Sequence, residues 1–290
     1  MPATAATSGS PPTTVADAVA VLDRLCPPRL AESWDNTGLL LGRRTDPVDR
    51  LMTCLTLTGD VAYDAVERGV SLVVTHHPIF FGGINSLTGD TREADGVLQL
   101  ARAGVAVYSP HTAFDSAPRG INWWLTQQLG LKNVQPLKPD ADDASLGSGR
   151  IGSLPEPLPL AELGRRLAHA VGVPGLHQVD GRQGRAESVI KVVAVACGAA
   201  GSMLDDAIAS GAECFVTGEI RFHDALRARS NGISLLIPGH YATERRATVW
   251  LAEQLAEQLP AVECGTSEIE TDPLRWQPVE GVGRVSKAAE

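Results

Sequence analysis

The sequence predicts an α/β protein in which a largely parallel sheet is covered by helices, and three observations lead to this fold class. From residue 51 onward, short apolar runs alternate with helical patterns, as they do when strands and covering helices follow one another along a chain. The same order of elements occurs twice. Hydrophobic residues make up 43% of the 290 residues, which is enough for the core of one large or two ordinary domains.

The first expected element is a helix whose start is marked by a capping box. The hydroxyl of Thr14 can accept a hydrogen bond from the helix backbone while Asp17, three residues on, returns one, and Pro27 with Pro28 ends the helix. Three strands with two helices between them follow, at 51–57, 61–68, 72–75, 96–103 and 105–108. Strands joined through helices in this way are parallel.

A middle segment separates this series from its repetition. Residues 135–187 are richer in Pro, Gly and Asp and carry one clear amphipathic helix, at 160–171. The alternation then resumes with strands and helices at 189–197, 202–209, 214–217, 224–230, 233–237 and, as a long helix, 242–259. We therefore expect five parts: a disordered tail at 1–12, a first α/β half at 13–134, a connecting segment with one helix at 135–187, a second α/β half at 188–280, and a tail at 281–290.

The two halves can be aligned residue by residue. A shift of 142 residues places the stretch DAVERGVSLVVT (64–75) on DAIASGAECFVT (206–217) without a gap, and His77 then falls on Glu219. Self-similarity at a fixed offset is the signature of a repeat. This match indicates an internal duplication.

A second match lies further along the chain. A shift of 129 residues places His111 on His240 and Asp115 on Glu244. In both halves a histidine thus follows an apolar strand, and a carboxylate comes four residues later. If the chain turns into a helix there, each pair shares one helix face.

Two adjacent histidines close the apolar run VVTHHPIFF (73–81). His76 and His77 lie at the carboxyl end of a predicted strand, where open α/β sheets bind their ligands. Adjacent side chains of an extended chain point to opposite sides, so the pair is better suited to hold two metal ions than to chelate one. A carboxylate such as Glu244 could bridge two ions about 3.5–4 Å apart. Imidazole and carboxylate ligands suit zinc, iron, manganese, cobalt or nickel and do not distinguish among them.

Each of these histidines also has an ordinary structural interpretation, because a histidine after a strand is usually a satisfied polar residue. Their joint pattern is what favours a metal site. His223 lies four residues after Glu219 and could act as an acid or base near the metals, or only form a hydrogen bond to Glu219. Both alternatives remain open.

Two further stretches invite a functional interpretation. The loop Trp34-Asp35-Asn36 could reach the same site, or only cap a helix and fill a gap, and the sequence does not decide between them. The stretch GSGRIG (147–152) has the spacing of a dinucleotide-binding turn, but it lies between KPDADDASL and a proline-rich segment instead of between a strand and a helix. A bend that glycine permits is the better interpretation.

Composition excludes several classes of function. A net charge of −9 argues against nonspecific binding to nucleic acid or to an anionic membrane. The five cysteines are odd in number, far apart and contain no CxxC, so neither a disulfide framework nor a thiolate zinc site is expected. The first twelve residues lack the basic start and apolar region of a secretory signal, and no apolar run approaches the roughly 18 residues that span a bilayer. We expect a cytoplasmic protein.

Five blocks of sequence, in order, resemble a known family. They are ESWDNTGLLLG, THHPIFF, SPHTAFDSAPRGIN, VTGEIRFHDAL and GHYATERRA. They are similar to signature blocks of the dinuclear metal-centre proteins labelled GTP cyclohydrolase 1 type 2, the NGG1-interacting-factor-3-like family. The likeness runs from about residue 14 to 275 and is weakest between 135 and 187. It implies a three-layer α/β/α fold of two intertwined, pseudo-symmetric halves, assembled as a toroidal homohexamer around an internal cavity.

The resemblance also implies a set of metal ligands. The ligands of the family fall on five residues of matching type, with Glu244 as the bridge: His76, His77, Asp115, His240 and Glu244. Two divalent metal ions per subunit would face the cavity. Some relatives carry an additional domain in the middle, for which the short connecting segment leaves no room.

The family label implies an activity. It is the hydrolysis of GTP by a metal-activated water to formate and 7,8-dihydroneopterin triphosphate, with His111, Glu219 or His223 as candidates for proton transfer. The sequence itself shows no guanine pocket and no phosphate loop. A metal-binding scaffold or interaction protein that forms a ring without catalysis is the alternative.

Overall fold

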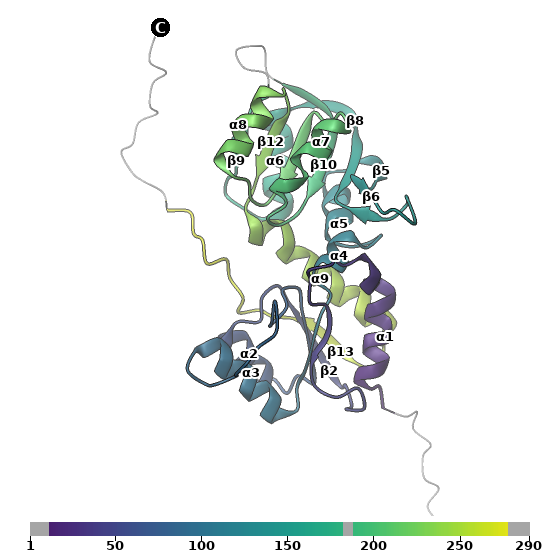
Figure 1. The fold of residues 1–290 in the computed structure, drawn as a ribbon, viewed down its shortest axis with the longest axis vertical. Coiled ribbons are helices and arrows are strands. Elements are labelled where there is room, and N and C mark those ends of the chain that lie inside the picture. The colour runs from purple at the N-terminus through teal and green to yellow at the C-terminus, as the bar shows by residue number, and fades with distance from the viewer. Residues whose placement is uncertain (1–11, 182–187, 278–290) are drawn as a thin grey trace, which may run out of the picture.

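The computed structural model describes residues 12–181 and 188–277 and contains two large sheets, each in its own lobe (Figure 1). Except for residue 12, the two expected tails lie outside the described residues. Within the described ranges, no helix combines the length and the apolar character needed to span a membrane.

The first lobe is built on a five-stranded sheet in the order β1-β4-β3-β2-β13. Its strands are β1 (Gly38–Leu41), β2 (Arg50–Cys54), β3 (Leu72–Thr75), β4 (Ala106–Ser109) and β13 (Glu263–Thr266). Its helices are α1 (Val15–Leu25), α2 (Gly59–Glu67) and α3 (Arg92–Ala103), with a 3-10 turn at Pro28–Leu30. All neighbouring strands are parallel except β1, which runs antiparallel to β4 at the edge.

The second lobe is built on a six-stranded sheet in the order β5-β8-β10-β11-β12-β9. Its strands are β5 (Lys132–Gln135), β8 (Arg150–Pro159), β9 (His177–Val179), β10 (Val189–Ala196), β11 (Cys214–Thr217) and β12 (Ser234–Ile237). The remaining elements are α4 (His111–Ser116), α5 (Ile121–Gln128), α6 (Leu160–Val171), α7 (Leu204–Ala209), α8 (Phe222–Ser230), α9 (His240–Gln258), a 3-10 turn at Gly201–Met203, and the short hairpin of β6 (Lys138–Pro139) and β7 (Gly147–Ser148). The three parallel strands β10, β11 and β12 form the middle of this sheet.

The two halves repeat one topology. The order α1-β1-β2-α2-β3-α3-β4 recurs as α6-β9-β10-α7-β11-α8-β12, and the spatial order β1-β4-β3-β2 recurs as β9-β12-β11-β10. The halves are intertwined, because α9 of the second half packs on β2 and β13, and α5 of the first half packs on β8 and β10 (Figure 1). The predicted α/β fold is confirmed.

Each sheet is covered by helices on both faces. In β3, Val73 packs into a cluster with α2 and α3, while Leu72 and Val74 belong to a central cluster. In the second sheet Phe215 likewise faces α7 and α8, and Val216 faces the central cluster. Alternate residues of a strand point to opposite faces, so both sheets share the central helices α1, α5, α6 and α9. The result is a three-layer α/β/α arrangement around each sheet.

The connecting segment contains more regular structure than the sequence indicated. Besides the helix at 160–171, it contributes β8 and β9 to the second sheet. The sequence obscured β8 because Pro155, Pro157 and Pro159 lie in its second half, and proline cannot donate to a strand ladder. The first half of β8 pairs with β10 on one side and, at residues 151–153, with β5 on the other. Among the described residues the half that carries the prolines pairs with β10 alone, so the structure accommodates them.

The bend predicted for GSGRIG is confirmed and is held by a buried arginine. Gly147 and Gly149 adopt φ values of +138° and +59°, and a strand follows instead of a helix. The guanidinium of Arg150, which is 3% exposed, donates to the carbonyl oxygens of both glycines and to those of Ser116 and Ala117 at the end of α4. Burial lowers its pKa to about 10, so it stays charged at neutral pH. The bend therefore fixes the helix that carries His111 and Asp115.

Removal of this arginine is expected to destabilise the protein. Arg150→Met removes the charged donor from four carbonyl oxygens, of which those of Gly149 and Ala117 keep a backbone donor. We expect the free energy of unfolding to fall by about 3 kcal/mol. Arg165→Met is the control, because its exposed ion pair with Glu162 contributes less than about 1 kcal/mol. Urea unfolding of both variants measures the difference. Equal stability of the two would contradict the role given to Arg150.

Candidate metal centre

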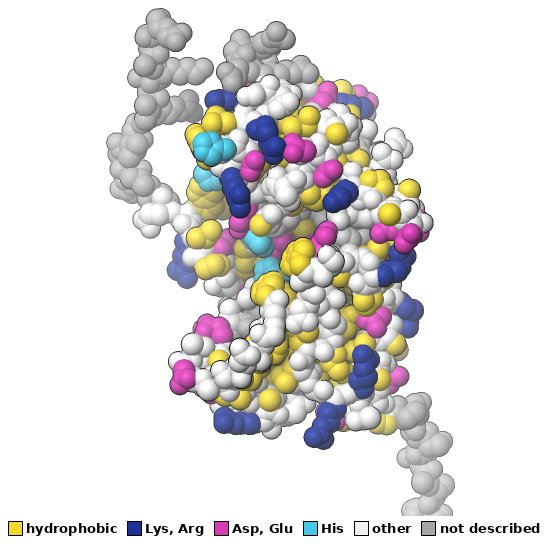
Figure 2. Space-filling model, in the orientation of Figure 1, with side chains coloured by type: hydrophobic (Ala, Val, Ile, Leu, Met, Phe, Trp, Pro, Cys, Tyr) yellow, Lys and Arg dark blue, Asp and Glu magenta, His cyan; other side chains and the backbone are white. Residues whose placement is uncertain are grey.

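Four histidines lie where the carboxyl ends of the parallel strands of the two sheets face each other. His76 and His77 come directly after β3, and His111 begins α4 after β4. His240 begins α9 after β12, the corresponding strand of the second half. Histidine side chains are visible at the waist between the two lobes, with hydrophobic side chains beside them (Figure 2). The repeated topology thus brings four strand-end imidazoles into one place.

One carboxylate oxygen of Glu244 faces two of these imidazoles. Glu244 Oε2 lies 3.3 Å from His77 Nε2 and 3.0 Å from His240 Nε2. Ligand atoms of these three residues lie within 4.8 Å of one another, so the group could hold a metal ion. His240 begins α9 and Glu244 follows about one turn later on the same face, as their spacing predicts.

The other oxygen of Glu244 faces a different set. His76 Nε2 lies 3.9 Å from Glu244 Oε1 and 3.7 Å from Asp115 Oδ1. His76 is 2% exposed, and neither of its ring nitrogens has a hydrogen-bond partner in the described part of the chain. A buried polar atom without a partner is costly, and a metal ion would satisfy it. The residues therefore fit a metal on this side of Glu244 as well.

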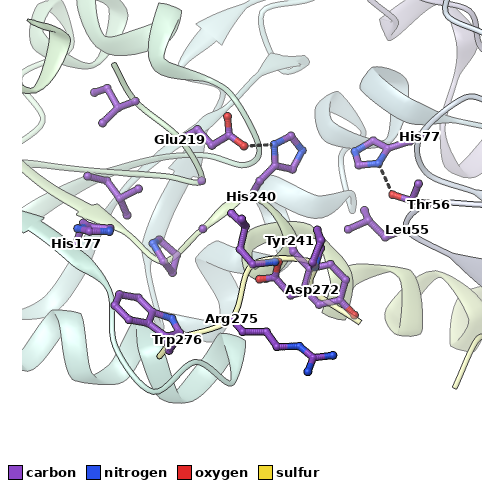
Figure 3. Close-up of a pocket in the computed structure, with 17 residues that line it drawn as sticks. Leu55, Thr56, His77, His177, Glu219, His240, Tyr241, Asp272, Arg275 and Trp276 are labelled. Carbon is purple, nitrogen blue, oxygen red and sulfur yellow. Dashed lines mark hydrogen bonds and ion pairs between the residues drawn. The ribbon is translucent and has the colours of Figure 1, made fainter. Parts of the chain in front are cut away.

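Hydrogen bonds orient the imidazoles on the Oε2 side. The hydroxyl of Thr56 lies 2.8 Å from His77 Nδ1, and Glu219 Oε1 lies 2.9 Å from His240 Nδ1 (Figure 3). In both rings this contact leaves Nε2 directed at Glu244. Partners of this kind fix the tautomer of a metal-binding histidine. Glu219, which the sequence singled out as a catalytic candidate, holds His240 in this arrangement.

His111 is held by a residue whose role the sequence left open. Its Nδ1 lies 2.7 Å from Asp35 Oδ1, whose side chain is fully buried, and Asp35 Oδ2 accepts hydrogen bonds from the backbone and hydroxyl of Thr112. His111 has φ +29°, a strained value for a residue with a side chain, and these bonds hold it there. Ligand atoms of His76, His77 and His111 also lie within 4.8 Å of one another. The loop at 34–36 thus reaches the site through Asp35.

Asp115 is positioned by two residues that the sequence did not single out. The thiol of Cys197 donates to Asp115 Oδ1 at 3.2 Å, and Asn122 Nδ2 donates to the carbonyl oxygen of Asp115 at 3.1 Å. The one sequence signal that could have pointed to Cys197 is its position directly after the predicted strand that became β10. Burial and the charge of Asp115 raise the pKa of its thiol well above the usual value. It is a neutral donor to Asp115.

His223 lies outside the cluster. It is exposed on α8, with its ring 5.6 Å from that of Phe222. In residues 12–181 and 188–277 it belongs to neither histidine group, and the hydrogen bond to Glu219 comes from His240 instead. The structure gives no support for its interpretation as an acid or base near the metals.

Electrostatics in the cluster are set by burial and by Glu244. Burial lowers the pKa of His76 well below its usual value, so this imidazole is neutral and able to bind a metal. Burial also raises the pKa of Glu244, but hydrogen bonds from His240 and His77 outweigh it and hold the pKa below the usual range. The hydrogen bond between His240 and Glu244 also raises the pKa of His240 to about 9. Burial and the charge of Glu244 raise the pKa of Asp115 well above its usual value.

The cluster opens to two cavities. One of 720 Å³ reaches His77 and His240, and its far end is lined by Trp276 and His177 (Figure 3). The other, of 410 Å³, reaches His111, Asp115 and Glu244. The larger has the size of a site for a small organic ligand.

Comparison with known proteins identifies the family. The model of the family Duf34/NIF3 (NGG1p interacting factor 3) matches residues 13–273. The chain belongs to the Duf34/NIF3 family. The NIF3 homolog of Schizosaccharomyces pombe is 37% identical over 235 residues, which cover 78% of this chain and 82% of that protein. A GTP cyclohydrolase 1 type 2 homolog of Streptomyces coelicolor is 33% identical over 233 residues, which cover 79% and 81%.

Solved structures show the same fold. The crystal structure of a hypothetical protein of Staphylococcus aureus matches with a TM-score of 0.84 and 25% identity, covering 92% of this chain and all of that one. A Bacillus cereus protein related to NIF3 matches with a TM-score of 0.85 at 20% identity, with the same coverage. The α/β fold of this NIF3-family chain is thus shared over nearly its whole length.

A glycine makes room for Glu244, and its substitution is expected to weaken metal binding in this NIF3-family chain. Gly198 has φ +62°, and a Cβ atom there would lie 2.2 Å from Glu244 Oε1. Gly198→Ala should displace the carboxylate and lower the affinity for zinc by about tenfold or more. Gly201→Ala is the control, because its nearest new contact is an ordinary 3.5 Å. Competition with a chelator measures both affinities, and an unchanged affinity in Gly198→Ala would contradict the placement of Glu244.

Metal affinity is expected to rise with pH. His240 has a pKa of about 9 in the metal-free protein, so it carries a proton at neutral pH that a metal must displace. The raised pKa of Asp115 acts in the same direction. The proton on His240 alone should make the affinity increase by up to about tenfold per pH unit and level off above pH 9, and a proton on Asp115 would make the increase steeper. Calorimetry in buffers of different ionisation enthalpy counts the released protons. His223 is exposed and outside the cluster, so His223→Ala should show the same increase of metal affinity with pH. A metal affinity that does not depend on pH would refute the role of His240 as a metal ligand.

Proposed function

We propose that this protein is a dinuclear metal-dependent hydrolase. One observation carries the proposal: the two oxygens of Glu244 face two separate sets of metal-binding atoms. His76 and Asp115 would hold one divalent ion with Oε1, and His77 and His240 would hold the second with Oε2. The expected opposite directions of the adjacent histidines are not what the structure has, because their ligand atoms lie within 4.8 Å of one another. They would serve different ions because His77 Nε2 lies near Oε2 of Glu244 and His76 Nε2 lies near Oε1.

The donor set supports hydrolysis. Two divalent ions bridged by a carboxylate act as Lewis acids and make water a nucleophile at neutral pH. Zinc, iron, manganese, cobalt and nickel all accept imidazole and carboxylate ligands. A buried cluster that is open to a large cavity suits an organic substrate.

His111 is the residue that we propose for proton transfer. Because the Asp35 carboxylate only accepts hydrogen bonds, His111 Nδ1 carries the proton and Nε2 is free to accept one. Hydrogen bonds from Thr112 and His111 outweigh the effect of burial and lower the pKa of Asp35, so it stays ionised. His111 Nε2 would take a proton and return it to the leaving group. Glu219 would position His240.

GTP is the first candidate substrate. The support is the name of several relatives, GTP cyclohydrolase 1 type 2 homolog. The reaction would be hydrolysis of GTP to formate and 7,8-dihydroneopterin triphosphate.

A metal-binding scaffold without catalysis is the second candidate. It is favoured by the position of the ligands, because His76 and His77 belong to the first lobe while His240 begins the helix that joins both lobes. Ions held between them would tie the lobes together. This candidate predicts bound metal and a loss of stability on its removal, without turnover.

Elemental analysis and turnover together test the proposal. Wild-type protein should hold about two ions per chain and release formate from GTP. Glu244→Ala should lose nearly all metal because both sets share this carboxylate, and His76→Ala should lose turnover. His223→Ala is the matched control and should keep both.

Three outcomes are distinct. Wild-type protein without metal refutes the metal centre. Two ions without turnover of GTP or of a panel of nucleotides and amides refute the hydrolase and leave the scaffold. Turnover that survives His76→Ala places catalysis elsewhere.

A further inference from the structure

The last described segment of the chain forms a wall of the larger cavity. After β13, residues 268–277, which we call the C-terminal strap, leave the first lobe and run alongside the second (Figure 1). Asp272, Arg275 and Trp276 of the strap line the 720 Å³ cavity that begins at His77 and His240. The strap thus faces whatever binds beside the proposed metal centre.

Glu270 fixes the strap in place. Its side chain is 4% exposed and accepts hydrogen bonds from the backbone of Leu55 at 3.0 Å and of Thr56 at 2.5 Å. Its carboxylate also lies 3.0 Å from Arg245 Nε, and Tyr241 donates its hydroxyl to the carbonyl oxygen of Glu270 at 3.0 Å. Since Thr56 also contacts His77, the strap is set at a defined position relative to the metal ligands.

Trp276 presents an aromatic surface at the far end of the cavity. Its ring lies 5.8 Å from that of His177 on β9, at an angle of 35°, and 53% of the residue remains exposed (Figure 3). Apolar residues such as Ile220 and Ile237 line the cavity between this end and His240. An exposed indole at the end of an apolar cavity is a surface on which a flat ring can stack.

The charged side chains of the cavity do not form a phosphate clamp. Of the described residues that line it, Arg275 has a permanent positive charge, His240 is protonated at neutral pH, and Glu219 and Asp272 carry negative charge. Phosphate groups are usually held by several cationic side chains or by a dedicated loop. The cavity side chains therefore offer stacking and apolar contact more than charge recognition.

From these contacts we infer that the cavity receives a flat, ring-bearing organic compound, stacked on Trp276 with its reactive end at His77 and His240. The inference rests on the proposed function for the chemistry at that end. The family match ends at residue 273, so residues 274–276 lie beyond it. Residues 268–273 of the strap lie within that match, so Trp276 belongs to the part of the strap in which this chain can differ from its relatives.

Binding of flat probes tests the inference. The panel is guanosine, adenosine, a pterin and riboflavin, with tripolyphosphate as a charged probe without a ring, each titrated into metal-free and metal-loaded protein. At least one ring compound should bind the wild type. Trp276→Ala should weaken it by about tenfold, and Trp276→Phe should restore most of the affinity because a ring remains. Tripolyphosphate should not respond to either variant.

Phe222→Ala is the matched control, since Phe222 is a 72% exposed aromatic residue on α8 that does not line the cavity. It should bind the rings as the wild type does. The inference is overturned if no ring compound binds the wild type, if Trp276→Ala binds like the wild type, or if Phe222→Ala loses as much.

Metal content is measured on the same samples and separates the two proposals. Loss of ring binding in Trp276→Ala with metal content unchanged supports the strap. If the wild type binds the rings but holds no metal, the proposed metal centre is refuted and the strap remains a ligand site. If the wild type holds two ions per chain and Trp276→Ala binds the rings as tightly as the wild type, the metal centre is supported and the role of the strap is refuted.

Discussion

The structure of the site depends on one buried carboxylate. Glu244 is 3% exposed, yet three imidazoles lie within 4 Å of its two oxygens. A buried, ionised carboxylate is stable only beside a positively charged partner. His240 supplies that charge in the metal-free protein, because Glu244 raises its pKa to about 9. A metal ion would take over the same role. Gly198 leaves the space that this carboxylate occupies.

The duplicated fold explains why two similar pairs of residues serve different purposes. His111 and Asp115 in α4 correspond to His240 and Glu244 in α9, and in each helix the histidine is the first residue and the carboxylate follows about one turn later. In both pairs a carboxylate from another loop holds the histidine by Nδ1: Asp35 for His111 and Glu219 for His240. Only His240, however, lies against the carboxylate of its own pair. The first half also carries His76 and His77, which have no histidine counterparts in the second half, so the two halves differ at this strand end.

Sequence patterns predicted the parts that rest on local spacing. The alternating strands and helices from β2 to β4 and from β10 to α9, the capping box at Thr14 and the two histidine and carboxylate pairs follow from spacing over a few residues, whereas β1, α5 and β13 were not predicted. Contacts between distant segments left no such signal. Asp35 meets His111 76 residues away, Cys197 meets Asp115 82 residues away, and Glu270 meets Leu55 215 residues away. These contacts exist only once the sheets have assembled, so no window of sequence reveals them.

Diffraction from crystals of zinc-loaded protein, recorded on both sides of the zinc absorption edge, tests the central claim most directly. If Glu244 bridges two ions, the anomalous map will show two peaks about 3.5–4 Å apart, on either side of its carboxylate. One should lie beside His76 and Asp115, and the other beside His77 and His240. A single peak among His76, His77 and His111, with Glu244 unbound, would contradict this account.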